Sequence, residues 1–243
     1  LNYRENRGNP MLNTNQLELS FYLQNDLKLS SRFTLMYGAR YDSQTNIHDR
    51  NNLDPRVGMA YSPGGATVIR GGVGFFHQRV PLNIIEAQRR LDGERQFEIV
   101  VDQPSFPNPF QAGTVHPRSR RITYPDLATP YNFIALASAE RTFFGNLVFS
   151  AAYDFEREVG RLRYRNLNAP LDLTSSAPRS CRAAQSPETC VRPEPSLGNI
   201  LNLESTGLER AHNFRLSFRQ RFSIFNVTSN YAMAVAYGDS IPN

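Results

Sequence analysis

The sequence predicts an all-β fold of about eight antiparallel strands, joined in pairs as hairpins. Two observations support this fold class. Apolar and polar residues alternate with a period of two in eight separate segments, and short turns connect these segments two by two. Only residues 82–91 suggest the 3.6-residue period of an amphipathic helix.

The first two predicted hairpins use four segments whose apolar residues fall mainly at odd positions: residues 17–24, 33–42, 56–61 and 69–75. Their even positions hold mostly polar, charged or small residues. A short segment at residues 29–32 forms the turn of the first hairpin, and a Pro-Gly-Gly sequence at residues 63–65 forms the turn of the second.

The last two predicted hairpins use four later segments: residues 131–141, 147–156, 214–219 and 227–237. The first of these is the weakest, because Ile134 and Leu136 fall on what should be its polar face. The turns are a Phe-Gly-Asn sequence at residues 144–146 and a segment at residues 223–226.

The two faces of the predicted strands differ in charge. We expect no Asp, Glu, Lys or Arg on the apolar face. A slip of one residue in any strand would move its side chains to the opposite face, so this contrast fixes the frame of each strand. Seven charged residues mark the predicted polar face: Arg40, Arg56, Arg70, Asp154, Glu156, Arg215 and Arg219.

The connections favour a membrane barrel over a soluble β-sandwich. The links between hairpins are long, at about residues 43–52, 80–128 and 157–209. Loops of more than about 12–15 residues are uncommon in compact domains, whereas outer-membrane barrels combine short periplasmic turns with longer extracellular loops. We therefore expect an antiparallel up-and-down transmembrane β-barrel segment with long extracellular loops. The seven charges would face the lumen, and the apolar face would contact outer-membrane lipid.

Composition argues against nucleic-acid binding and against membrane-spanning helices. The chain has 27 basic and 22 acidic residues among its 243, and every basic residue except Lys28 is arginine. The arginines are scattered, whereas nucleic-acid binders cluster their basic residues, so we expect no nucleic-acid partner. No apolar run reaches the roughly 18–20 residues of a membrane-spanning helix.

The sequence offers no catalytic constellation. Its four histidines are far apart, and it lacks both a nucleophile elbow and a complete dinucleotide fingerprint. We therefore expect no enzyme activity, no cofactor and no metal site. Cys181 and Cys190 are a candidate disulfide of an oxidising compartment, with a pair of free thiols as the alternative.

The long loop at residues 80–128 carries the features that suit ligand recognition. Three phenylalanines, Phe97, Phe106 and Phe110, lie among prolines that restrict the backbone. They could contact a ligand or pack the loop on itself. The basic run from Arg118 to Arg121 could attract phosphates or an acidic ligand, or it could be a solvated charge cluster.

Several segments resemble the barrel of TonB-dependent outer-membrane receptors, especially the Oar-like group that carries a carboxypeptidase-regulatory-like domain. They follow the order and spacing of that family: residues 21–26 (FYLQND), 35–41 (LMYGARY), 54–63 (DPRVGMAYSP) and 67–76 (TVIRGGVGFF), with weaker matches at 129–131, 165–168 and 221–222. Leu27 departs from the pattern, because the family tends to place Trp there.

The resemblance implies a receptor in the outer membrane of a Gram-negative-type bacterium. The resemblance implies that the complete protein has a barrel of about 22 strands around a plug. It also implies a TonB box that couples the plug to an energy source in the inner membrane. Residues 1–243 would be part of the barrel only, without plug, TonB box or closing strands. The resemblance implies capture of an unknown extracellular ligand and energy-coupled uptake.

The sequence leaves two other interpretations open. A structural or adhesive barrel, or a passive pore, would have the same strands without coupling to TonB. A soluble β-sandwich that binds a ligand would place the apolar faces against one another instead of against lipid.

Overall fold

The computed structural model of the protein describes residues 2–64, 66–172, 179–181 and 190–239. The chain divides into two compact units, each described here by itself. The sheet unit consists of the segments Leu17–Arg79, Ala128–Leu162 and Ser205–Asn243. The loop unit consists of the segments Leu1–Gln16, Val80–Leu127 and Arg163–Glu204.

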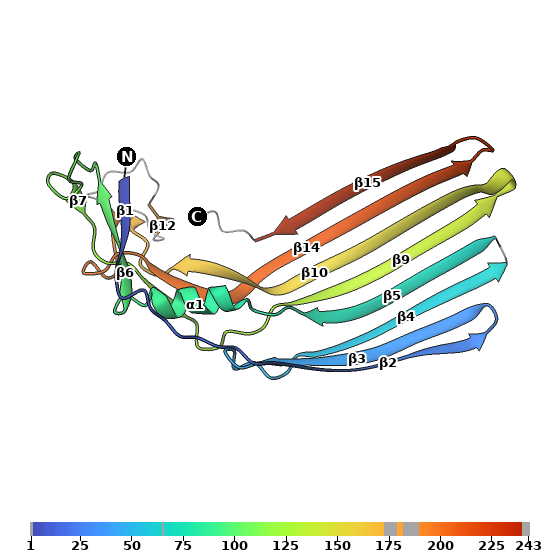
Figure 1. The fold of residues 1–243 in the computed structure, drawn as a ribbon, viewed down its shortest axis with the longest axis horizontal. Helices are drawn as coiled ribbons and strands as arrows, with labels where there is room; N and C mark the ends of the chain where they lie inside the picture. Colours follow the sequence, from blue (N-terminus) through green and yellow to red (C-terminus); the bar gives the residue numbers. More distant parts are fainter. Residues whose placement is uncertain (1, 65, 173–178, 182–189, 240–243) are drawn as a thin grey trace. The chain divides into compact units, whose positions relative to one another are not determined.

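The sheet unit is built from eight long strands that follow one another as in a meander, with the order β15-β14-β10-β9-β5-β4-β3-β2 (Figure 1). Neighbouring strands in the run β2, β3, β4, β5, β9 and β10 pair antiparallel, and so do β14 and β15. The strands are β2 (Glu18–Ser30), β3 (Phe33–Gln44), β4 (Leu53–Gly64), β5 (Thr67–His77), β9 (Tyr131–Phe143), β10 (Leu147–Asn166), β14 (Ile200–Arg221) and β15 (Asn226–Gly238).

This arrangement confirms the predicted all-β antiparallel fold. The sheet is open among the described residues, because the edge strands β2 and β15 each pair with one neighbour. The four short connections fall at the four predicted turns, although residue 65 of the second turn lies outside the described residues. The connection between β9 and β10 is a 3-10 helix at Phe144–Asn146. In the part of the chain that the structure describes, no helix is long and apolar enough to cross a membrane.

Strand register places the apolar residues on one face of the sheet. Residues directly opposite each other in a pair of strands share a face. One row runs across five strands through residues that are each opposite the next: Tyr37, Val57, Val73, Ala135 and Phe155. We call this side of the sheet the apolar face.

The neighbouring row belongs to the opposite side, which we call the polar face. It runs through Gly38, Arg56, Gly74, Ile134 and Glu156. The strand register puts all seven charged residues named above on this face. The apolar residues Ile134 and Leu136 lie there too, opposite Gly74 and Gly72.

The expectation of an uncharged apolar face is wrong at Arg141. This residue lies opposite Phe149 and therefore on the apolar face. It is close to the end of β9, and its guanidinium carbon lies 5.2 Å from the ring centroid of Phe143. A long arginine side chain near a strand end can lay its methylene stem along apolar surface and keep its charge in the polar region.

Two strands are longer than the sequence predicts. β10 continues to Asn166 and β14 begins at Ile200, so part of the predicted loop at residues 157–209 is strand. Charged residues such as Arg157, Glu158 and Arg161 occur there on both faces, which removes the alternation of apolar and polar residues. Backbone pairing does not require that alternation, so the strands continue where the sequence signal ends.

The loop unit contains short elements within the predicted loop at residues 80–128. These are α1 (Leu82–Arg90), β6 (Gln96–Asp102), β7 (Thr114–Val115) and β8 (Arg120–Thr123). β6 lies between β7 and the N-terminal strand β1 (Asn2–Gly8), while β8 pairs in parallel with the first residues of β14. The remaining strands of the unit, β11 (Leu171–Asp172), β12 (Arg179–Ser180) and β13 (Cys190–Val191), form a separate small sheet.

A small apolar core holds the loop unit together. Val80, Ile85, Val101 and Leu203 are buried there. Glu204 is also buried, with 2% of its side chain exposed, and it accepts hydrogen bonds from two arginines of β10: Arg163 Nε at 3.0 Å and Arg165 Nε at 3.0 Å. A buried carboxylate held by two cations is satisfied in its charge and in its hydrogen bonds.

Candidate functional site

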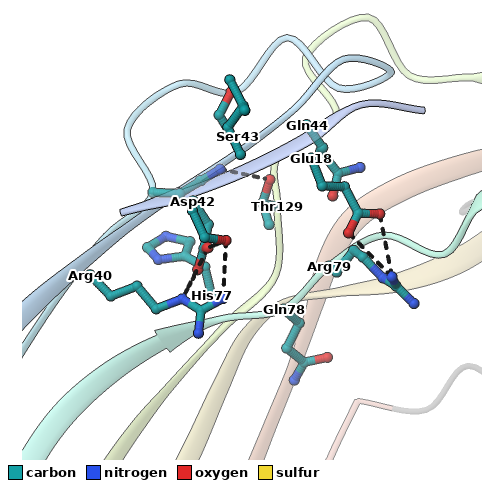
Figure 2. A pocket seen from close by; sticks show the side chains of 12 residues that line it. Glu18, Arg40, Asp42, Ser43, Gln44, His77, Gln78, Arg79 and Thr129 are labelled. Atoms are coloured by element: carbon teal, nitrogen blue, oxygen red, sulfur yellow. Dashed lines mark hydrogen bonds and ion pairs between the residues drawn. The ribbon is translucent and has the colours of Figure 1, made fainter. Parts of the chain in front are cut away.

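A polar pocket of about 270 Å³ lies at one end of the sheet unit, where the long links between the hairpins begin (Figure 2). The start of β2 and the ends of β3 and β5 form its walls. Its lining residues are Glu18, Leu19, Ser20, Arg40, Asp42, Ser43, Gln44, Asn52, His77, Gln78, Arg79 and Thr129.

The first wall of the pocket is a pair of opposite charges on β3. Arg40 and Asp42 are two residues apart in a strand, so they share the polar face. The Nε of Arg40 donates to both carboxylate oxygens of Asp42, at 3.0 and 2.8 Å. Ser20, directly opposite Asp42 on β2, donates its hydroxyl to that carboxylate and accepts from Arg40 at 3.1 Å.

The second wall is a histidine bound to a buried carboxylate. Asp54 accepts the backbone N–H of His77 at 3.0 Å, and the Nδ1 of His77 lies 2.6 Å from the Asp54 Oδ1. Both side chains are nearly buried, with 6% of Asp54 and 11% of His77 exposed. The imidazole ring also lies 5.3 Å from the ring of Tyr131, measured between centroids.

The third wall joins residues that are distant in sequence. Arg79 lies 3.2 Å from the carboxylate of Glu18. Asn52 donates its Nδ2 to the Thr129 Oγ1 at 3.3 Å, while the backbone N–H of Thr129 donates to Asp49. Among the described residues the buried Oδ1 of Asn52 has no hydrogen-bond partner.

The pocket is therefore polar but electrically balanced. The two carboxylates that line it are each held by an arginine: Asp42 by Arg40 and Glu18 by Arg79. Such a lining suits recognition of an uncharged polar group through hydrogen bonds. Within the ranges that the structure describes, no group of three or more His, Cys, Asp or Glu residues could hold a metal ion.

The structure brings only Arg40 of the seven predicted charges into this pocket. Asp154 lies further along the polar face, where it accepts from Arg215 and from Asn213, both at 2.7 Å. Glu156 accepts instead from Asn132 at 2.6 Å. The remaining predicted charges, Arg56, Arg70 and Arg219, lie on the same face outside the pocket.

Sequence reasoning missed Asp54 and His77 as partners. The two residues are 23 positions apart and sit on neighbouring strands, so only the register of β4 against β5 brings them together. The one signal in the sequence is the position of a histidine directly at the end of an alternating segment.

Aromatic residues of the loop unit have different roles. Phe110 packs edge-on against Tyr3 at 5.8 Å between ring centroids, and Arg118 stacks over Phe97 at 4.0 Å. Phe106 is 97% exposed. Two of the three phenylalanines therefore pack within the loop unit, and one faces solvent.

The N-terminal strand β1 carries an ion pair on the same unit. Glu5 accepts from the Arg7 Nε at 2.5 Å and from the Tyr3 hydroxyl at 2.7 Å. These two hydrogen bonds, with that from Arg7 the stronger, lower the pKa of the Glu5 carboxyl. In the same unit, burial lowers the pKa of the Arg192 guanidinium.

The structure joins Cys181 and Cys190 by a disulfide, with 6.1 Å between their Cα atoms. The bond closes a short loop whose interior, residues 182–189, lies outside the described residues. Cys190 begins β13, which pairs with β11 through Asp172.

A family model for the outer membrane beta barrel domain matches residues 46–241, which include most of the strands of the sheet. The chain belongs to the outer membrane beta-barrel domain family. It is therefore a protein of the bacterial outer membrane, and its apolar face is the kind of surface that such barrels present to lipid. No curated protein matches the sequence.

Solved structures with a similar fold are outer-membrane transporters and receptors. The outer membrane transporter YddB from Escherichia coli has a TM-score of 0.64 and 15% sequence identity over 91% of this chain and 24% of its own. The FrpB iron transporter from Neisseria meningitidis has a TM-score of 0.57 and 11% identity over 92% of this chain and 26% of its own.

The ferric enterobactin receptor PfeA from Pseudomonas aeruginosa has a TM-score of 0.55 and 10% identity over 90% of this chain and 26% of its own. At these identities the likeness concerns the fold alone. The chain spans about a quarter of the length of these three structures.

Proposed function

We propose that this chain is part of the barrel of an outer-membrane receptor of the TonB-dependent kind, within its Oar-like group. The receptor captures a ligand with its extracellular loops and takes it up with energy from the TonB system. The observation that carries the proposal is the division of one sheet into an apolar and a charged face. In a membrane barrel the first faces lipid and the second faces the lumen.

Charged residues on the polar face give the lumen its character. Arg40, Asp154 and Arg215 take part in ion pairs with oppositely charged neighbours, so the wall is polar without a strong excess of one sign. A wall of this kind lets a bulky polar ligand pass without trapping it by charge. The fold shared with transporters supports a passage function.

The loop unit supplies the ligand-capturing surface in this proposal. Apart from residues 1–16, it lies in the long connections between hairpins. Long connections are extracellular in outer-membrane barrels. It exposes Phe106 and several arginines, while a packed core and a disulfide hold its backbone in place. Preorganised loops bind with less loss of conformational entropy.

In this proposal the complete receptor has further strands and a plug, and the chain's span of about a quarter of the length of the similar transporters is consistent with this. The plug couples to TonB in this proposal. A scarce and bulky nutrient, such as an iron chelate, a vitamin, or a glycan or peptide fragment, is the cargo class.

Uptake measurements in cells test the proposal. Cells with and without the gene are given labelled iron chelates, vitamins, oligosaccharides or peptides, each with the TonB system intact or inactivated. We expect uptake of one of these classes to fall to the same low level when either the gene or TonB is lost. Uptake that depends on the gene but not on TonB would indicate a passive pore instead. Normal uptake of every class together with altered cell adhesion would indicate a structural role.

A further inference from the structure

A second pocket, of about 210 Å³, lies in the loop unit and carries a different balance of charge. Three arginines line it, Arg4, Arg120 and Arg121, against a single carboxylate, that of Glu98. Its other lining residues are Asn6, Leu91, Ser119, Asn199 and Leu201.

Four segments that are distant in sequence build this pocket. β1 pairs antiparallel with β6, which places Asn6 opposite Glu98. Glu98 in turn forms an isolated bridge with Ser119, just before β8. β8 then runs parallel to the start of β14, with Arg121 beside Leu201. Backbone pairing therefore fixes the positions from which the three arginines extend.

Apart from the Glu98 carboxylate, three hydrogen-bond acceptors beside the arginines are already used. The Oγ of Ser119 accepts the backbone N–H of Asn199 at 2.9 Å. The Oδ1 of Asn199 accepts from Asn166 at 2.9 Å and from Arg192 at 3.1 Å. The backbone carbonyl of Asn199 accepts the N–H of Arg120 at 2.9 Å.

The hydrogen-bond donors, in contrast, have few partners. Among the described residues the side chain of Arg120 makes no hydrogen bond or ion pair. The Arg121 guanidinium lies over the ring of Tyr164, at 5.3 Å from its centroid, and this contact uses its face and leaves its N–H edge available. Arg4 is 3.9 Å from Glu98, too far for a hydrogen bond.

We propose that this pocket binds an oxyanion, the phosphate or carboxylate group of the diffusible ligand that the receptor captures. The inference rests on the proposed function, because it names the chemical class that the capturing surface recognises. Planar guanidinium groups present pairs of N–H donors that match the oxygens of phosphates and carboxylates. An acceptor-rich anion would use the guanidinium N–H groups of Arg120 and Arg121, which donate no hydrogen bond among the described residues.

The proposal is tested with the full-length protein in detergent micelles, using pyrophosphate and citrate as probes in isothermal titration calorimetry at constant ionic strength. Arg120→Gln removes a guanidinium that has no described partner, so the fold should be retained. We expect it to weaken binding of at least one probe by about tenfold or more, the effect of losing a charge-assisted hydrogen bond. Arg118→Gln is the matched control. It removes the same charge two residues before Arg120, and the side chain of Arg118 stacks on Phe97 outside the pocket.

A second measurement needs no variant. Phenylglyoxal modifies accessible arginines, and mass spectrometry of the modified protein locates them. We expect the better-bound probe to protect Arg120 and Arg121 and to leave Arg118 reactive.

Three results would overturn the proposal. One is the absence of binding for both probes, and another is an equal loss of affinity in the Arg118→Gln control. The third is binding of lipopolysaccharide added to the same micelles, dependent on Arg120, with neither soluble probe bound; the pocket would then recognise a lipid phosphate. Because the assay measures binding without an energised membrane, its failure leaves the uptake prediction intact, and a failure of uptake leaves the binding result intact.

Discussion

Placing an arginine on each face of the same strand tests the orientation of the sheet. Ala135 and Leu136 are neighbours on β9, and register puts them on opposite faces. Ala135 lies opposite Val73 and Phe155 on the apolar face. Leu136 lies opposite Gly72 and Asp154 on the polar face. The pair Ala135→Arg and Leu136→Arg therefore adds the same side chain at nearly the same depth.

The depth follows from the strand length. Val73, which is level with Ala135, lies six residues beyond the start of β5 at Thr67. At about 3.4 Å per residue this is about 20 Å along the strand, or about 15 Å along the membrane normal for a tilt of about 40°. Ala135 is then near the middle of an apolar band about 25 Å tall, where an arginine that faces lipid costs about 2–4 kcal/mol.

Folding of the full-length protein into vesicles, followed by heat-modifiable migration in gels and by guanidinium titration, measures this cost. We expect Ala135→Arg to lose about 2–4 kcal/mol of stability. Leu136→Arg should be nearly neutral, since its guanidinium can reach water and the carboxylate of Asp154. Equal destabilisation by the two variants, or a greater loss for Leu136→Arg, would refute the assigned faces.

Three further predictions concern the loop unit. Alkylation without reductant, followed by mass spectrometry, should leave Cys181 and Cys190 unlabelled; labelling of both would remove the disulfide. Glu204→Gln should destabilise the loop unit by about 1–3 kcal/mol, because the two arginines that hold the buried carboxylate lose their charged partner. Faster hydrogen exchange of β14 near residue 204 would show this loss, and unchanged exchange would contradict it. Hydrogen bonds from Arg7 and Tyr3 lower the pKa of Glu5 in the folded chain. The contribution of the ionised Glu5 to the stability of β1 is therefore complete above the pKa that Glu5 has in the unfolded chain. It is lost as the pH falls through the lower pKa of the folded chain. Proteolysis of β1 should therefore increase with acid in the natural protein and depend less on pH in Glu5→Gln; identical pH profiles would count against this ion pair.

The long strands whose faces we assign to lipid and lumen are the parts of the fold that the sequence predicts well. Hydrocarbon on one side and a polar environment on the other impose an alternation of residues, as in the segments at 33–42 and 56–61, and the structure has strands β3 and β4 there. The same constraint identifies the short turns. Strand pairing across the long links, such as β5 with β9, follows from the order of hairpins in a meander.

Structural features that depend on backbone pairing, without lipid contact, cannot be predicted from the residue pattern of the sequence. The last residues of β10 have lost the alternation, so residues such as Arg163 and Arg165 read as loop although they are strand. The pairing of β1 with β6 joins segments about 90 residues apart, and neither has a clear period. Local patterns contain no information about such long-range partners.

The pairs of residues in and beside the polar pocket likewise differ in whether the sequence predicts them. Arg40 and Asp42 are two residues apart on one strand, and their pairing follows from strand geometry alone. The Asp54 and His77 pair depends on the register between two strands and on the turn that sets it. Side chains on different strands become predictable only when the register is known.

The central claim is that alternate residues of each strand contact lipid and the lumen. A nitroxide label placed in turn at single cysteines along residues 133–140 of the full-length protein in bilayers, in a background without Cys181 and Cys190, tests it most directly. The account predicts that labels at odd positions collide mainly with oxygen, which dissolves in lipid, and labels at even positions mainly with a water-soluble nickel chelate. Equal access of the nickel chelate to odd and even positions, or shielding of the odd positions from both reagents, would contradict it.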